Sequence, residues 1–147
     1  MTTTTIIALT EDELDTLVSI AIRRAEILED MRSPAATDAW QEVMLYEERL
    51  AMLTPAAEIT GGVARVGAVR AALAAGQRLD AARLASQYLD DDTLPTERRA
   101  AIGQVFDEDQ ERLAQRFPAL AKRGRLAELH EWRIIASASP RVFPCAA

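Results

Sequence analysis

Residues 10–31, TEDELDTLVSIAIRRAEILEDM, contain the clearest structural signal in the chain. Thr10 followed by Glu13 is a capping box, in which each side chain bonds to the other residue's backbone N–H at the start of a helix. The three acidic residues after Thr10 also suit the positive end of the helix dipole. Apolar residues then recur at steps of three and four along one face: Leu14, Leu17, Val18, Ala21, Ile22, Ala25 and Leu28. The stretch predicts an amphipathic helix with one face against a core.

A second helix is predicted to follow after a short link. Ser33-Pro34 or Thr37-Asp38 is a suitable start, and Thr54-Pro55 ends it, so the two helices form an antiparallel hairpin. The inward stripe of the second helix is expected to contain Trp40, Val43, Met44, Leu50, Ala51 and Leu53. The outer faces of the hairpin are expected to carry its acidic side chains: Glu26, Glu29, Asp30, Glu42, Glu47 and Glu48.

The second half of the chain predicts shorter helices rich in alanine and arginine. Gly61-Gly62 is interpreted as a break, and Gly76 ends a small-residue helix over 63–75. Further helices are predicted over 79–89, from 95 or 97 to 117, and over 125–138. Residues 76–95 resemble the turn and second helix of a tetratricopeptide unit, but no second copy follows at the repeat step, so the resemblance implies only a tight helical hairpin.

These patterns predict an all-α fold, because no stretch indicates a central strand. We expect a single irregular bundle of five to six helices over 10–139, built from antiparallel helical hairpins. It combines an acidic hairpin (10–54) with helices over 62–138, and is flanked by a flexible arm (1–9) and a loose tail (140–147). The single cysteine excludes an internal disulfide, and no signal peptide or membrane-spanning run is recognisable, so we expect a cytoplasmic protein.

The composition argues against most catalytic chemistry. The chain has one histidine, one cysteine and one lysine among 28 alanines and 16 arginines. Structural zinc and bundle di-iron sites need more ligands than these, and His130 is about two helical turns, roughly 10 Å, from Ser137. We therefore expect no cofactor, no metal and no enzyme activity. A carboxylate-based magnesium enzyme is retained as an alternative, with candidate ligands Asp90, Asp91, Asp92, Asp107, Glu108 and Asp109.

Charge is distributed unevenly along the chain. Residues 1–60 contain 12 acidic and 4 basic side chains (net −8), whereas residues 61–147 contain 11 acidic and 13 basic ones (net +2). The basic segment 112–133 makes a DNA-binding regulator an alternative, although the overall net charge of −6 disfavours contact with phosphates. An acidic hairpin that mimics nucleic acid is a further alternative.

By elimination, the sequence favours a non-catalytic adaptor, companion subunit or regulator of a larger bacterial assembly, for example an effector, defence or antidefence system. Its partner is expected to be another protein, because the arm can add a strand to a partner sheet, the charges can orient a complex and the tryptophans can anchor an interface. The candidate partner-binding residues are Ile6, Ile7, Glu26, Glu29, Trp40, Glu47, Arg116, Arg123, Arg125 and Trp132.

Overall fold

The computed structural model describes residues 8–119. Within this range the chain forms five helices and no strand: α2 (Glu11–Asp30), α3 (Ala36–Leu53), α4 (Ile59–Ala74), α5 (Arg78–Leu89) and α6 (Thr96–Arg116). The predicted all-α bundle is confirmed. Residues 1–7 of the predicted arm, the predicted helix over 125–138 and the tail over 140–147 lie outside the described residues.

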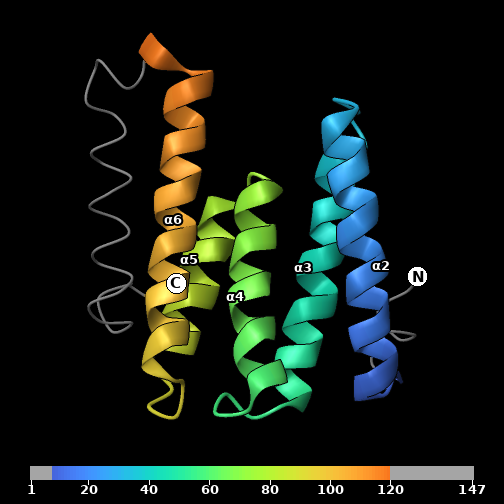
Figure 1. The fold of residues 1–147 in the computed structure, drawn as a ribbon, viewed down its shortest axis with the longest axis vertical. Coiled ribbons are helices and arrows are strands. Elements are labelled where there is room, and N and C mark those ends of the chain that lie inside the picture. The colour runs from blue at the N-terminus through green and yellow to red at the C-terminus, as the bar shows by residue number, and fades with distance from the viewer. Residues whose placement is uncertain (1–7, 120–147) are drawn as a thin grey trace, which may run out of the picture.

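The predicted capping box is present at the start of α2. Thr10 Oγ1 accepts a hydrogen bond from the Glu13 amide at 3.3 Å, and Glu13 Oε2 accepts one from the Thr10 amide at 2.9 Å. Helix α3 runs back along α2 as the second arm of an antiparallel hairpin (Figure 1). The predicted stripe of α2 faces inward: Leu14, Val18, Ala21 and Ala25 are buried, and Leu17, Ile22 and Leu28 are partly buried.

Helix α4 is the centre of the bundle. It packs against α3, α5 and α6, whereas α2 packs against α3 (Figure 1). More than half of its residues are buried, and most of these are alanine or glycine: Gly61, Gly62, Ala64, Val66, Ala68, Val69, Ala71, Ala72 and Leu73. Small side chains let several helices approach one axis closely, so α4 is buried on more than one side.

The predicted break at Gly61-Gly62 is wrong, because α4 begins at Ile59 and both glycines lie in its first turns. A Cβ atom at Gly61 would lie 2.0 Å from the Pro55 carbonyl oxygen, and one at Gly62 would lie 3.0 Å from Arg98 Cγ. The glycines therefore make room for a neighbouring loop and for a side chain of α6. Close approach, and not the end of a helix, explains this pair.

Two residues that the helical patterns place on an inward face, one in α3 and one at the end of α6, are partly exposed. Leu53 is 39% exposed at the last position of α3. Phe117 is 43% exposed directly after α6. Among the described residues, no helix combines the length and apolar content that crossing a bilayer requires.

Candidate functional site

Three adjoining cavities share the side chain of Trp40. They have volumes of about 650, 210 and 300 Å³. Each cavity is lined by residues of α3, α4 and α6, and two of the three are also lined by residues of α2. Ala71 and Ala74 of α4 also line these cavities, and their methyl side chains take up little space there. We call this set of cavities the Trp40 groove.

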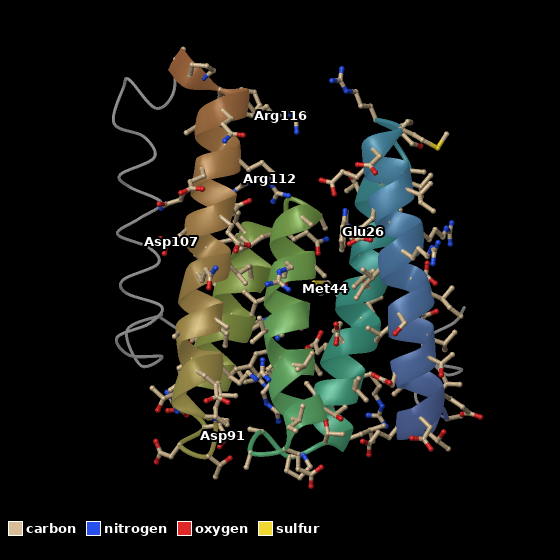
Figure 2. All side chains as sticks on the ribbon, viewed as in Figure 1. Glu26, Met44, Asp91, Asp107, Arg112 and Arg116 are labelled. Atoms are coloured by element: carbon tan, nitrogen blue, oxygen red, sulfur yellow. The ribbon has the colours of Figure 1, made fainter. Side chains whose placement is uncertain are left out.

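The first part of the groove is crossed by a polar network that begins at Trp40. The Trp40 indole Nε1 donates a hydrogen bond to Glu29 Oε2 at 3.3 Å, and the other oxygen of Glu29 lies 3.7 Å from Arg112 of α6. Figure 2 shows Arg112 and Arg116 extending from α6 towards the α2–α3 hairpin. Arg112 thus connects α6 with α2, two helices at opposite edges of the bundle.

The network continues from Arg112 into the bundle. Arg112 also contacts Asp109 at 2.8 Å, and Arg78 of α5 contacts the second oxygen of Asp109 at 3.3 Å. Asp109 is 6% exposed, so its charge is taken out of water and is balanced by two guanidinium groups. The network fixes the position of Arg112 at the groove.

The 300 Å³ cavity contains a buried acid, Glu47 of α3. Its side chain is 3% exposed, which corrects the prediction that it lies on the outer face of the hairpin. Gly67 of α4 makes this burial feasible, because a Cβ atom there would lie 2.2 Å from Glu47 Oε1. The sequence did contain the signal: position 47 follows Trp40 and Val43 at helical steps of three and four, on the same stripe.

Burial shifts the titration of Glu47. Desolvation raises the pKa of its carboxyl group to about 8, Asp15 of α2 adds to the rise, and Arg70 of α4 opposes it. At neutral pH the group is therefore mostly protonated. A carboxylic acid in this form donates one hydrogen bond and accepts others.

The walls of the groove carry opposite charges. The hairpin wall carries three acids and one arginine: Glu26, Glu29 and Glu47, with Arg32. The facing wall, from α4 and α6, carries four arginines and two acids: Arg70, Arg98, Arg112 and Arg116, with Glu108 and Asp109. The uneven charge distribution along the chain thus leaves an excess of acid on one wall of the groove and of arginine on the other. A bound molecule would meet an acidic and a basic wall.

All five of the described candidate residues line this groove. Trp40 is common to the three cavities, Glu26 and Glu47 line the cavity of about 300 Å³, and Glu29 and Arg116 line that of about 650 Å³. The other candidates, Ile6, Ile7, Arg123, Arg125 and Trp132, lie outside the described residues.

Sequence reasoning did not select Arg70 and Arg98 as site residues, and it included Arg112 only in the basic segment 112–133. Arg98 reaches the groove because its side chain crosses Gly62 of α4, and Arg112 because it reaches Glu29 of α2. Both contacts join residues far apart in the chain. No local periodicity contains that information.

The candidate magnesium ligands are not brought together. Within residues 8–119 no group of three or more His, Cys, Asp or Glu side chains is arranged to hold a metal ion. Asp91 accepts hydrogen bonds from the amide and hydroxyl of Thr93 at 2.9 and 2.6 Å, which lower the pKa of its carboxyl group. Figure 2 shows Asp91 near the start of α6 and Asp107 farther along that helix.

The basic segment 112–133 is described only as far as residue 119. Within this part, Arg112 is engaged by Glu29 and Asp109, and Arg116 lies over the ring of Phe117 with 5.4 Å from its guanidinium carbon to the ring centroid. These two side chains face the groove as well as solvent.

Comparisons of the chain with protein-family models, with curated proteins and with solved structures find no match.

Proposed function

We propose that the chain is a non-catalytic adaptor or companion subunit that binds a segment of a partner protein in the Trp40 groove. The observation that carries this proposal is the convergence of Glu26, Glu29, Trp40, Glu47 and Arg116 on one groove. A larger bacterial assembly, such as an effector, defence or antidefence system, is the proposed setting.

The composition of the groove suits a protein segment. Tryptophan and arginine are enriched among residues that dominate binding at protein interfaces, and Trp40 lies at the junction of the cavities. The two charged walls would favour one orientation of a partner that carries the complementary charges. The small residues of α4 at the groove let a partner backbone approach closely.

Photocrosslinking in the native host tests this proposal. A benzophenone amino acid at Thr37, an exposed residue of the cavity of about 650 Å³, is expected to crosslink one partner protein. The same amino acid at Leu79, which is 79% exposed on α5 outside the groove, is the matched control and should give no such product. Crosslinking of the same protein from both positions, or from neither, would contradict the proposal.

Charge reversal gives an independent measurement with the captured partner. Arg116→Glu alters the basic wall at an exposed site, so we expect affinity to fall about tenfold or more. Arg23→Glu makes the same change at an exposed position of α2 that lines none of the three cavities. It should leave affinity within about twofold.

A further inference from the structure

The cavity at Glu47 contains a buried acid that lacks a bonding partner among the described residues. Glu47 lines the cavity of about 300 Å³ and is 3% exposed, yet its carboxyl group makes no hydrogen bond or ion pair within residues 8–119. The nearby charges act on it only through space. A buried polar group without a partner carries a free-energy penalty, which an entering donor would remove.

The other charged residues of this cavity restrict the kind of ligand. Glu26 and Glu47 come from the α2–α3 hairpin, while Arg70 of α4 and Arg98 of α6 come from the other side. With Glu47 ionised these four charges sum to zero. A pure cation would leave a net charge in the cavity, and a pure anion would be balanced only with Glu47 protonated and would not pair with Glu26. A ligand with both charges pairs with the acids on one side and the arginines on the other.

The rest of the lining is apolar. Three helices contribute valine and isoleucine side chains to it: Ile22, Val43, Val63 and Val66. The ring of Trp40 also lines the cavity. Such surface suits an aliphatic group on the ligand. A volume of about 300 Å³ is at the small end of ligand-binding cavities, which fits a molecule of the size of an amino acid.

We infer that this cavity binds a small zwitterion, namely a free amino acid with an aliphatic side chain. Its ammonium group lies against Glu47 and Glu26, and its carboxylate lies against Arg70 and Arg98. The ammonium supplies the hydrogen-bond donors that Glu47 lacks, and the aliphatic side chain covers the valines. The chain alone forms this site, so the amino acid binds in the absence of a partner protein, and a partner segment that fills the whole Trp40 groove would displace it.

The site has a characteristic dependence on pH. The charged groups that face Glu47 are Asp15 and Glu26 from α2, Arg70 from α4 and Arg98 from α6. Because an ammonium group pairs with the ionised form of Glu47, whose pKa is about 8, binding releases a proton from that carboxyl group. The dissociation constant should therefore fall about tenfold from pH 6 to pH 7.

Titration of the full-length ¹⁵N-labelled chain with L-leucine, L-leucinamide and N-acetyl-L-leucine tests the ligand class. The amide lacks the carboxylate and the acetylated form lacks the ammonium group. We expect L-leucine to shift the Gly67 amide and Trp40 indole signals, and to bind about tenfold more tightly than either blocked form. Equal binding of the three compounds, or no shift at about 10 mM L-leucine, overturns the proposal.

Two variants identify the groups that recognise each charge. Glu47→Gln keeps the shape of the protonated acid and removes the anion, so L-leucine affinity should fall about tenfold or more while the spectrum stays folded. Glu48→Gln is the matched control, since Glu48 lines a different cavity and pairs with Arg83. Arg98→Gln leaves Arg70 in place and should therefore reduce the preference for L-leucine over L-leucinamide several-fold. Wild-type affinity in Glu47→Gln, or an unchanged preference in Arg98→Gln, overturns the proposal.

Discussion

Arg32 and Gly76 occupy the same backbone position at the ends of two helices. Each takes a positive φ, 53° for Arg32 after α2 and 74° for Gly76 after α4. In both cases this residue and the next one, Ser33 or Gln77, donate amide hydrogen bonds of 2.9 Å back into the last turn. This left-handed ending suits glycine, whereas a side chain strains it. The Cβ position of Gly76 is open, so strain is the only obstacle to a side chain there.

Exchanging the residue types at these positions should change stability in opposite directions. Arg32→Gly removes the strain and is expected to raise the free energy of unfolding by about 0.5–1 kcal/mol, after allowance for the greater freedom of glycine in the unfolded chain. Gly76→Ala should lower it by a similar amount. Urea denaturation at one pH measures both changes. Destabilisation by both variants would contradict this account of the two helix ends.

Glu47 makes stability depend on pH. Its pKa is about 8 in the folded chain and near its ordinary value of about 4.5 in the unfolded chain. Between these values the folded state holds a proton that the unfolded state has lost. The free energy of unfolding therefore falls as pH rises from about 4.5 to about 8, by up to about 1.4 kcal/mol per unit, and this contribution changes little outside that range.

Glu47→Gln should remove this contribution. The difference in stability between the variant and wild type is expected to grow in favour of the variant from pH 5 to pH 8, because the amide cannot ionise. Glu48→Gln, at the neighbouring and half-buried position, is the control and should give a difference that changes little with pH. Denaturation curves at several pH values within this range provide the measurement. A constant difference for Glu47→Gln would show that the acid is not held in its neutral form.

At the scale of the helices, glycine has two different roles. Gly62 and Gly67 of α4 provide space for Arg98 and Glu47, side chains that belong to other helices. Gly103 of α6 has nothing within 4 Å of the place where a Cβ atom would lie. The sequence does not distinguish Gly67 from Gly103, since both lie within predicted helices, and it places Gly62 at a break that the structure does not contain.

Alanine at Gly67 and at Gly103 should separate the two roles. Gly67→Ala is expected to destabilise by about 1–3 kcal/mol, because the new methyl group displaces a buried side chain. Gly103→Ala should stabilise by about 0.5–1 kcal/mol through reduced backbone entropy in the unfolded chain. In a Glu47→Ala background, Gly67→Ala should cost at least about 1 kcal/mol less. Additive effects of these two substitutions, measured by denaturation, would exclude the contact as the cause.

The elements themselves were largely predictable. The capping box at Thr10, the stripe of α2 and the turn at Gly76 are local patterns, and the structure contains each of them. Errors arose where long-range packing determines the outcome: α4 starts before Gly61-Gly62, and Glu47 is buried. The candidate residues were chosen for residue type and position on the predicted helices, whereas the groove that collects them depends on how the helices are assembled.

For the molecule as a whole, the contacts are centred on α4. Among the helices of residues 8–119, α2 packs closely against α3 alone, so it is the outermost of these helices on its side. The ion pair between Glu29 and Arg112, with 3.7 Å between the charged atoms, joins this outer helix to α6 across the groove. Both side chains of this ion pair are about half exposed to solvent, so the pair contributes little to global stability. Its effect should instead be on local opening.

Native-state hydrogen exchange measures this hierarchy directly. Amides in the middle of α4 should exchange only through global unfolding. Those of α2 should exchange through an opening that costs at least about 1 kcal/mol less, because α3 is the one helix of residues 8–119 that packs closely against α2. Glu29→Gln weakens the bridge to Arg112 and should speed exchange in α2, with little change in α4. Glu26→Gln is the matched control on the same helix, and it leaves that bridge intact. If α2 and α4 exchange through one opening of equal free energy, the bundle is a single cooperative unit, and the groove between its walls opens only when the whole fold does.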